Sequence, residues 1–570
     1  MGAPVHSDHV LPKRFSSKAM CLDRQLALRL MNHFGCSFAE LPGGFLESLR
    51  RWQWDKLCGS LTLAVSNSPQ YKKSLGREQT LAAIRNTAAS YEISFPCPPN
   101  ALQKEKPCPY SAQAAVMKSP HIPVLQNGVP RRSPHWQEFQ RDSALLAAEG
   151  ITCRFSAAVT SLLEQLPFTF SDDLSRSPDA FLAVSQGDVT GIISLPTSGT
   201  TGPGKRIYCT PDDLAETAAF FQYGMEYMVL PGQGEHVALL MSGDRPGSVG
   251  ELLMRGMRAL GVPCSVPGFV RPDPQGESDM LARLRELVPT CLVGVPGQVL
   301  GLARHARADE LAKTVRCVLL SGDAVTPALR DGISAGLNCE VFVHYGLTET
   351  GLGGAVECGE HLGCHMREAD MLFEILDESG RPLPDGVWGE IAVTTLTRRA
   401  MPLIRYRTGD EGLVEPGPCP CGSIFKRIRV RGRMSQRILL SDGSHLHITD
   451  IDRLLYELSF VQGYDAVLHL PPDSADSEAK KQAGSSCLAL TVRYGPGTPS
   501  DARARVERSL AGLAGVSVVR TALDLERCVA ALPLLIREQS ECEDARRQEK
   551  ATLVSGQAKQ TIRHVREPVF

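Results

Sequence analysis

The sequence predicts an α/β fold, with a large N-terminal body of mostly parallel sheets covered by helices and a small, mobile α/β C-terminal domain. The length of 570 residues is more than one hydrophobic core usually serves. Between residues 156 and 430, short apolar β-branched runs alternate with helical patterns, which is typical of parallel strands joined by helices. After Gly432 the pattern changes to that of a smaller unit.

The N-terminal body is predicted to cover residues 1–432 and to begin with helices. Apolar positions recur at helical spacing between residues 45 and 75, with a break at Asn67-Ser68-Pro69. Proline clusters then interrupt the pattern, so we expect an irregular insertion over about residues 77–154.

Five short strands are expected in the rest of the body. Ligands of parallel sheets gather at the loops beyond the carboxyl ends of the strands, so functional residues should follow these runs. The strand-like runs are residues 191–194, 237–241, 291–295, 315–320 and 340–343.

Residues 433–570 are predicted to form the small C-terminal lid domain. Strand-like runs at residues 436–440, 466–470 and 487–493 precede or surround a helical pattern at residues 501–513. This mixture indicates a compact α/β unit.

The composition, with 43% hydrophobic and 22% charged residues, is that of a folded globular protein. A formal net charge of -2 gives no broad positive field, so we do not expect a nucleic-acid partner. No run reaches the roughly 18 apolar residues of a membrane span, and no apolar segment follows Lys13 and Arg14. We therefore expect no membrane association and a cytoplasmic location, where most of the 18 cysteines stay reduced.

A glycine-rich and hydroxyl-rich loop follows the first of these strands. It contains Thr197, Ser198, Gly199, Thr200, Thr201 and Gly202 and ends at Lys205. Small residues let backbone N–H groups approach a polyanion, hydroxyls donate hydrogen bonds, and a lysine adds positive charge. The spacing is not that of a Walker loop. From composition alone, a phosphate cradle and an ordinary polar loop remain equally open.

Further polar segments follow later strands. Ser321-Gly322-Asp323 is a small-residue turn, and His344-Tyr345-Gly346-Leu347-Thr348-Glu349 follows the strand at residues 340–343. Tyr345 can stack on a purine, Thr348 can bond a phosphate oxygen, and Glu349 can hold a Mg²⁺ that bridges phosphates. The alternative is a polar surface turn.

Two segments complete the series. Met401–Asp410 ends in Thr-Gly-Asp, and the carboxylate of Asp410 can accept both vicinal hydroxyls of a ribose. Arg431-Gly432-Arg433 lies at the predicted domain boundary.

In this order, the four segments resemble the signatures of the adenylate-forming, AMP-producing enzyme superfamily. The chain is similar to phenylacetate-coenzyme A ligases in three features: the sequence of Ala400–Tyr406, the N-terminal helices, and the pair Cys419 and Cys421. The resemblance implies two steps. A carboxylate attacks the α-phosphorus of ATP to give an acyl-adenylate and pyrophosphate, and the thiol of coenzyme A then displaces AMP.

The resemblance also implies roles for individual residues. Lys205, Thr348, Glu349 and Lys559 are expected to act in catalysis, with Glu349 holding Mg²⁺. Contacts to ATP or coenzyme A are expected from Thr197, Ser198, Gly199, Thr200, Thr201, Gly202, Ser321, Gly322, Asp323, His344, Tyr345, Gly346, Asp410, Arg433 and Gly443.

The sequence departs from the family at its C-terminal lysine. Gln557 stands where that lysine is expected. In an extended segment, residues two apart point to the same side, so Lys559 could replace it, although a surface lysine explains the residue equally well. The hinge also differs, because Ser435 and Gln436 follow Met434 where the family has an aspartate.

Four residues match positions that hold a structural zinc in some relatives: Cys358, His365, Cys419 and Cys421. Thiolates and an imidazole suit tetrahedral Zn²⁺. Cys364 competes with His365 as a ligand, and ordinary reduced cysteines remain an alternative.

The leading hypothesis is therefore a coenzyme A ligase for an aryl or other small carboxylic acid, which Arg245 or His344 could contact. One alternative transfers the acyl group to a carrier-protein thiol or an amine. Another is a nucleotide-binding scaffold without activity, motivated by Gln557. Relatives are often homodimers, and a homodimer is an open expectation here.

Overall fold

A computed structural model describes most of the chain. The described ranges are residues 44–93, 154–195, 205–439, 445–470, 487–511, 517–522 and 562–566, with short breaks at 227, 231, 244–246, 272–273 and 496, together with positions 26, 29, 30, 33 and 34. Among the described helices, none is long and apolar enough to cross a membrane.

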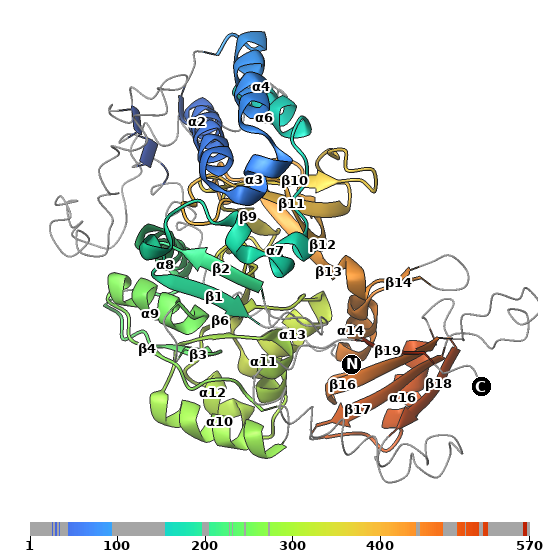
Figure 1. The fold of residues 1–570 in the computed structure, drawn as a ribbon. Helices are drawn as coiled ribbons and strands as arrows, with labels where there is room; N and C mark the ends of the chain where they lie inside the picture. The colour runs from blue at the N-terminus through green and yellow to red at the C-terminus, as the bar shows by residue number, and fades with distance from the viewer. Residues whose placement is uncertain are drawn as a thin grey trace, which may run out of the picture.

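The body begins with a group of helices at one end of the molecule (Figure 1). They are α2 (Gly44–Asn67), α3 (Pro69–Ser74), α4 (Arg77–Ser90) and α6 (Arg154–Glu164). The predicted break is confirmed, since the Ser68 hydroxyl caps α3 by accepting the Tyr71 backbone N–H at 3.4 Å.

The predicted insertion starts too early. Residues 77–90 form α4, which buries Thr80, Ile84, Thr87 and Ala88 in contact with the other N-terminal helices. Small and threonine side chains give this helix little apolar contrast, so the pattern was misjudged as irregular. Residues 94–153 lie outside the described part of the chain.

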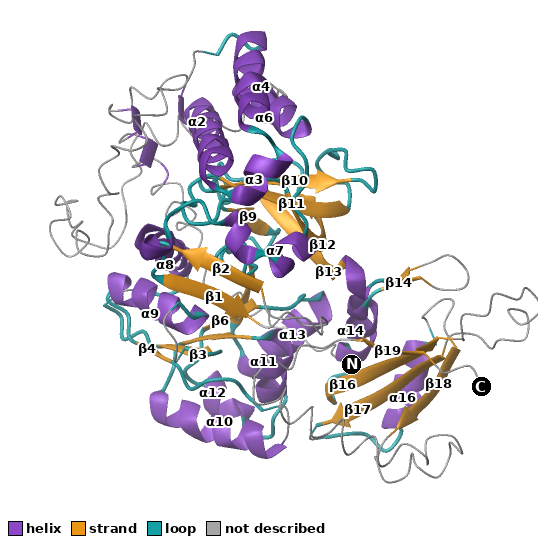
Figure 2. Cartoon of the chain, viewed as in Figure 1, coloured by secondary structure: helices purple, strands orange, loops and turns teal. Residues whose placement is uncertain are grey.

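An eleven-stranded mixed sheet runs through the described body (Figures 1 and 2). One half is parallel and the other is antiparallel, and the two halves meet at β7. In order across the sheet, the strands are β10 (Met371–Leu376), β11 (Gly389–Thr395), β12 (Tyr406–Val414), β13 (Arg427–Arg433), β9 (Cys364–Met366), β8 (Ala355–Glu357), β7 (Glu340–Tyr345), β6 (Cys317–Ser321), β5 (Cys291–Gly294), β3 (Val237–Leu240) and β4 (Cys264–Ser265).

The parallel half is buried on both faces, which explains its continuous apolar runs. Helices cover it: α8 (Pro211–Met225), α9 (Val249–Leu260), α10 (Pro274–Leu287), α11 (Pro296–Ala303), α12 (Ala308–Ala312) and α13 (Pro327–Leu337). Two of them start at Thr-Pro pairs, where Thr210 and Thr326 cap the helix and proline takes the first helical position. The α/β class and the strands predicted from residue 237 to 343 are confirmed.

The first predicted strand does not join this sheet. Within the described residues, β1 (Gly191–Leu195) pairs only with β2 (Lys205–Cys209), in an antiparallel hairpin. The hairpin packs near two short helical segments, α7 (Ser171–Arg176) and η3 (Pro178–Phe181). A third segment, η4 (Gln186–Asp188), follows η3 in the chain. The reason is local: β1 and β2 are close together in the sequence, so the two segments satisfy each other's backbone hydrogen bonds.

The C-terminal part contains a separate four-stranded sheet. Its order is β18 (Ser517–Ala522), β17 (Cys487–Tyr494), β16 (Val461–Leu470) and β19 (Ile562–Arg566), with helices α14 (Ile448–Tyr456) and α16 (Ala502–Leu510) beside it. Residues predicted as one strand at 436–440 divide into η5 (Met434–Gln436) and β14 (Ile438–Leu439), which pairs with β15 (His445–Leu446).

Helices α14 and α16 share one apolar cluster with α10, α11 and α13 of the body. Arg304, just after α11, donates hydrogen bonds to the carbonyls of Tyr456 at 2.6 Å and Leu458 at 3.1 Å. The C-terminal part is therefore held against the body by apolar burial and by a guanidinium that satisfies carbonyls at the end of α14.

Candidate active site

Three buried side chains meet beyond the carboxyl end of β7. Lys205 Nζ lies 2.5 Å from Glu349 Oε1 and donates to the hydroxyl of Tyr406 at 3.0 Å. The Tyr406 hydroxyl in turn donates to Glu349 Oε1 at 2.6 Å. The three exposed fractions are 6%, 4% and 0%, respectively, for Lys205, Glu349 and Tyr406.

The carboxylate of Glu349 stays ionised in this cluster. Burial alone would raise its pKa, but the charge of Lys205 and hydrogen bonds from Lys205 and Tyr406 outweigh burial and leave the pKa below its usual value. Arg398 holds the turn by donating to the Glu349 carbonyl at 3.1 Å, and the neighbouring Thr348 is also buried. A lysine and an ionised carboxylate therefore lie together at the strand ends.

The role of Tyr406 was missed by the sequence analysis, which quoted it only as part of a motif. Tyr406 and Asp410 both lie in β12, whose register against β11 shifts between Arg407 and Glu411, so strand alternation does not relate their side chains. The available signal was that Tyr406 stands in the same short motif as Asp410, which had already been assigned to the site.

Asp410 is held by two other predicted site residues. The hydroxyl of Tyr345 donates to Asp410 Oδ2 at 2.8 Å, and Arg433 Nε lies 3.0 Å from Asp410 Oδ1. Arg433 also donates to the Thr408 carbonyl at 3.1 Å. Burial and the Asp410 charge raise the pKa of Tyr345 well above its usual value, so this phenol stays protonated as a donor. Tyr345, Asp410 and Arg433, far apart in sequence, therefore converge.

Two predicted glycines occupy positions that a side chain would disturb. Gly322 has φ +93°, a left-handed conformation that favours glycine. A Cβ on Gly346 would lie 2.2 Å from the Leu352 carbonyl oxygen and 2.7 Å from the His344 ring. Between them in space, Ser321 pairs with His344 across β6 and β7, and Asp323 accepts the Ala324 N–H at 2.9 Å.

Some predicted residues lie outside the described part of the chain. They are Thr197, Ser198, Gly199, Thr200, Thr201, Gly202, Gly443 and Lys559, together with Gln557 and Arg245. Their roles stay predictions.

Known proteins match a large part of the chain. A family model described as AMP-binding enzyme covers residues 163–397. The phenylacetate-coenzyme A ligase of Thermus thermophilus is 27% identical over 380 residues, which make up 63% of this chain and 83% of that enzyme. Residues 163–397 therefore form an AMP-binding domain of the adenylate-forming enzyme superfamily.

Within this superfamily, the chain falls in the branch that resembles phenylacetate-coenzyme A ligases. The Pseudomonas putida phenylacetate-coenzyme A ligase is 29% identical over 306 residues, or 52% of this chain and 66% of that enzyme. A crystal structure of 2-hydroxyisobutyryl-CoA ligase in the postadenylation state superimposes with a TM-score of 0.53 over 72% of this chain and 88% of that one. At 18% identity, this likeness supports the fold alone.

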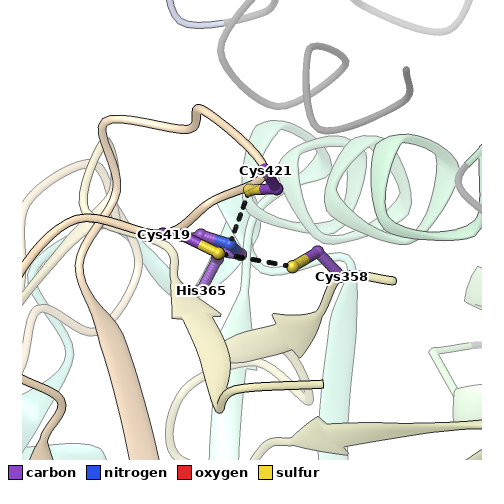
Figure 3. Close-up of side chains that lie close together, drawn as sticks. All are labelled: Cys358, His365, Cys419 and Cys421. Carbon is purple, nitrogen blue, oxygen red and sulfur yellow. Dashed lines mark hydrogen bonds between the residues drawn. The ribbon is translucent and has the colours of Figure 1, made fainter. Parts of the chain in front are cut away.

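The four predicted metal ligands also come together in the structure (Figure 3). The sulfur atoms of Cys358, Cys419 and Cys421 and a ring nitrogen of His365 all lie within 4.8 Å of one another. His365 Nδ1 is hydrogen-bonded to the Phe425 carbonyl at 2.9 Å, which leaves Nε2 directed at the sulfurs. Three sulfurs and one oriented imidazole fit a closed tetrahedral zinc site.

The competing cysteine does not belong to that cluster. Cys364 precedes His365 in β9, so the two side chains point to opposite faces of the strand. The Cys364 thiol lies 3.4 Å from the Val343 carbonyl oxygen, to which it donates. His365 is therefore the better candidate ligand of the two.

Proposed function

We propose that the protein activates a small carboxylic acid, of the aryl class, with ATP and transfers the acyl group to coenzyme A. The observation that carries this proposal is the buried group of Lys205, Tyr406 and Glu349 beside the Asp410 cluster, at the carboxyl ends of the strands. The names of the phenylacetate-coenzyme A ligases among its relatives support the substrate class and the thiol acceptor.

Adenylation would use charged side chains that already lie in the site. The carboxylate of the acid attacks the α-phosphorus of ATP, and pyrophosphate leaves. Because an anion approaches a polyanion, the barrier falls mainly through fixed positive charge and positioning. Lys205 would exchange its contact with Glu349 for a phosphate oxygen, and Thr348 would donate to another. Asp410 would accept the ribose hydroxyls.

Glu349 is the residue that would hold Mg²⁺ once Lys205 has moved to phosphate. A bound Mg²⁺ would neutralise phosphate charge. Tyr406 would keep donating to Glu349 Oε1 throughout, so the carboxylate would remain oriented. Cys358, His365, Cys419 and Cys421 would hold a structural Zn²⁺ that joins distant loops and takes no part in the reaction.

Residues 433–570 would act as the lid over residues 1–432 in both half-reactions. Lys559 is proposed to reach the reacting carboxylate in place of Gln557, and Gly443 to admit the pantetheine arm of coenzyme A. The thiol would then attack the acyl carbon and release AMP.

The test is carboxylate-dependent exchange of labelled pyrophosphate into ATP, across a panel of aryl and aliphatic acids, followed by detection of the coenzyme A thioester. Exchange with at least one acid, abolished by Lys559→Ala, would support adenylation and the displaced lysine. Exchange that appears only in Gln557→Lys would contradict the role of Lys559. If no acid supports exchange in either protein, the chain is a nucleotide-binding scaffold and the proposal is wrong.

A further inference from the structure

One buried histidine in the site has a ring nitrogen that nothing satisfies. His344 lies near the end of β7, and its Nδ1 is 2.9 Å from the Ser321 hydroxyl oxygen. Its Nε2 is fully buried and has no hydrogen-bond partner in the described part of the chain. A buried polar atom without a partner destabilises the protein.

Other histidines of the described chain do not share this feature. Both ring nitrogens of His236 are used, by the Leu287 carbonyl at 2.7 Å and the Ser265 hydroxyl at 2.9 Å. Those of His361 contact Glu340 and Glu357. The unsatisfied Nε2 of His344 is therefore a property of its position and not a general feature of buried histidines in this fold.

The surroundings of His344 are aromatic and apolar. The ring centres of Phe220 and Phe221, from α8, lie 6.0 and 6.1 Å from the imidazole. Gly353 is required beside them, since its Cβ would lie 2.4 Å from the Phe220 ring. Burial lowers the pKa of His344 to about 4, so the ring is neutral near pH 7. A neutral imidazole offers a hydrogen bond and no fixed charge.

His344 is also adjacent to the groups proposed to act on ATP. The next residue, Tyr345, donates to Asp410, and the Ser321 partner ends the neighbouring parallel strand β6. The ring thus lies at the carboxyl ends of two strands, where ligands of such sheets bind. Because Nδ1 is occupied by Ser321, Nε2 on the far side of the ring is the atom left for a ligand.

We propose that His344 Nε2 hydrogen-bonds the acyl part of the substrate, which makes the preferred substrate an aryl acid with a neutral hydroxyl or amino substituent. This inference rests on the proposed function and narrows its substrate class. The reacting carboxylate is a poorer match, because a neutral ring beside two phenylalanines supplies no charge to balance it. A plain aryl acid would leave Nε2 unsatisfied, and sites built around such a hydrogen bond strongly reject the analogue that lacks it.

The experiment measures kcat/KM for pyrophosphate exchange by the full-length protein with matched acids. Phenylacetate and benzoate are compared with their 2-, 3- and 4-hydroxy and amino derivatives. Wild type is expected to prefer one substituted acid over its parent by about 100-fold or more. His344→Phe, which keeps a ring but removes the nitrogen, should reduce that preference to within about threefold and leave the KM for ATP unchanged.

A conservative variant and a matched control complete the test. His344→Gln retains a hydrogen-bonding group and should keep most of the preference, which also covers the case in which His344→Phe fails to fold. His236→Gln, at the opposite ends of the strands, should leave it unchanged. Equal activity of wild type with parent and substituted acids would overturn the inference while leaving the proposed function standing, as would an equal loss for all acids in His344→Phe. No exchange with any acid would overturn both.

Discussion

Two ion pairs lie at opposite ends of the parallel half of the sheet. Lys205 and Glu349 meet beyond the carboxyl ends, where their side chains are 7% and 5% exposed. Glu235 and Arg316 pair just before β3 and β6, at the amino ends. Glu235 also accepts a hydrogen bond from Thr290, which precedes β5, at 2.5 Å.

The two pairs differ in what could replace each partner. The guanidinium of Arg316 is 38% exposed, and the pair joins the starts of three strands, so it serves as a fixed connection. Lys205 and Glu349 are both enclosed and both attached to Tyr406, at the end where ligands of parallel sheets bind. In the carboxyl-end pair, a phosphate could replace Glu349 as the partner of Lys205, and Mg²⁺ could replace Lys205 as the partner of Glu349. The amino-end pair is suited instead to stabilising the fold.

The largest expected effect separates the two pairs directly. Glu349→Gln should lower pyrophosphate exchange by about 10³-fold, because the site loses the charge that would hold Mg²⁺. Glu235→Gln should lower the thermal midpoint and leave turnover of the folded enzyme nearly unchanged. Exchange rates and calorimetry on both variants check this. Similar losses of exchange in both would remove the functional distinction between the strand ends.

The Cys/His cluster provides a third polar group that should behave as a closed structural site. Cys419→Ser is expected to lower zinc bound per chain by more than about tenfold and to reduce the midpoint of thermal unfolding. Elemental analysis of purified protein measures the metal. Cys339→Ser, which changes a buried thiol outside the cluster, should retain the metal content. Equal zinc in wild type and Cys419→Ser would contradict the assignment.

The Asp410 cluster should respond mainly in nucleotide binding. Asp410→Asn removes a charged acceptor for the ribose and is expected to raise the KM for ATP about 10- to 100-fold. Asp385→Asn is the control, since Asp385 forms an exposed pair with Lys426 at 2.9 Å. A change confined to the KM for the acid would assign Asp410 to another ligand.

Tyr406 should sharpen the comparison, because it hydrogen-bonds both partners of the carboxyl-end pair, whereas Thr290 donates to Glu235 of the amino-end pair. Tyr406→Phe is expected to lower turnover about tenfold and to raise the Mg²⁺ concentration needed for half-maximal activity. Tyr71→Phe removes another buried phenol, which contacts the Ile404 N–H at 3.0 Å, and should leave the Mg²⁺ dependence unaltered. Identical Mg²⁺ titrations for wild type and Tyr406→Phe would refute the positioning role.

The smallest effect concerns pH. The pKa of Glu349 is below its ordinary value of 4.5, despite burial, because of Lys205 and Tyr406. A carboxyl whose pKa falls on folding contributes stability above its unfolded pKa, and this is lost as the pH falls through the folded value. The difference in free energy of unfolding between wild type and Glu349→Gln should therefore shrink below about pH 4.5. Urea unfolding at pH 7 and pH 4 measures it, and a constant difference would contradict the prediction.

The sequence by itself determined the class of fold and most strands of the parallel half, and it supplied the candidate site residues apart from Tyr406. Continuous apolar runs such as the one in β3 indicate a strand that is buried on both faces. This pattern can be recognised from neighbouring residues in the sequence alone. Motifs rich in glycine, hydroxyl and charged residues likewise carry their chemistry locally. The helix α4 and the separate β1–β2 hairpin were misjudged because their contacts, not their composition, decide their place.

Only the tertiary structure decided which of these residues touch. Lys205 and Glu349 are 144 positions apart, Tyr345 and Asp410 are 65 apart, and no periodicity connects them. The choice of His365 over Cys364 depends on which face of β9 meets the Cys419 loop, and the unsatisfied nitrogen of His344 depends on what surrounds it. Hydrogen bonding and burial are properties of neighbours in space, so a single sequence can name the chemical groups without showing which of them remains free for a ligand.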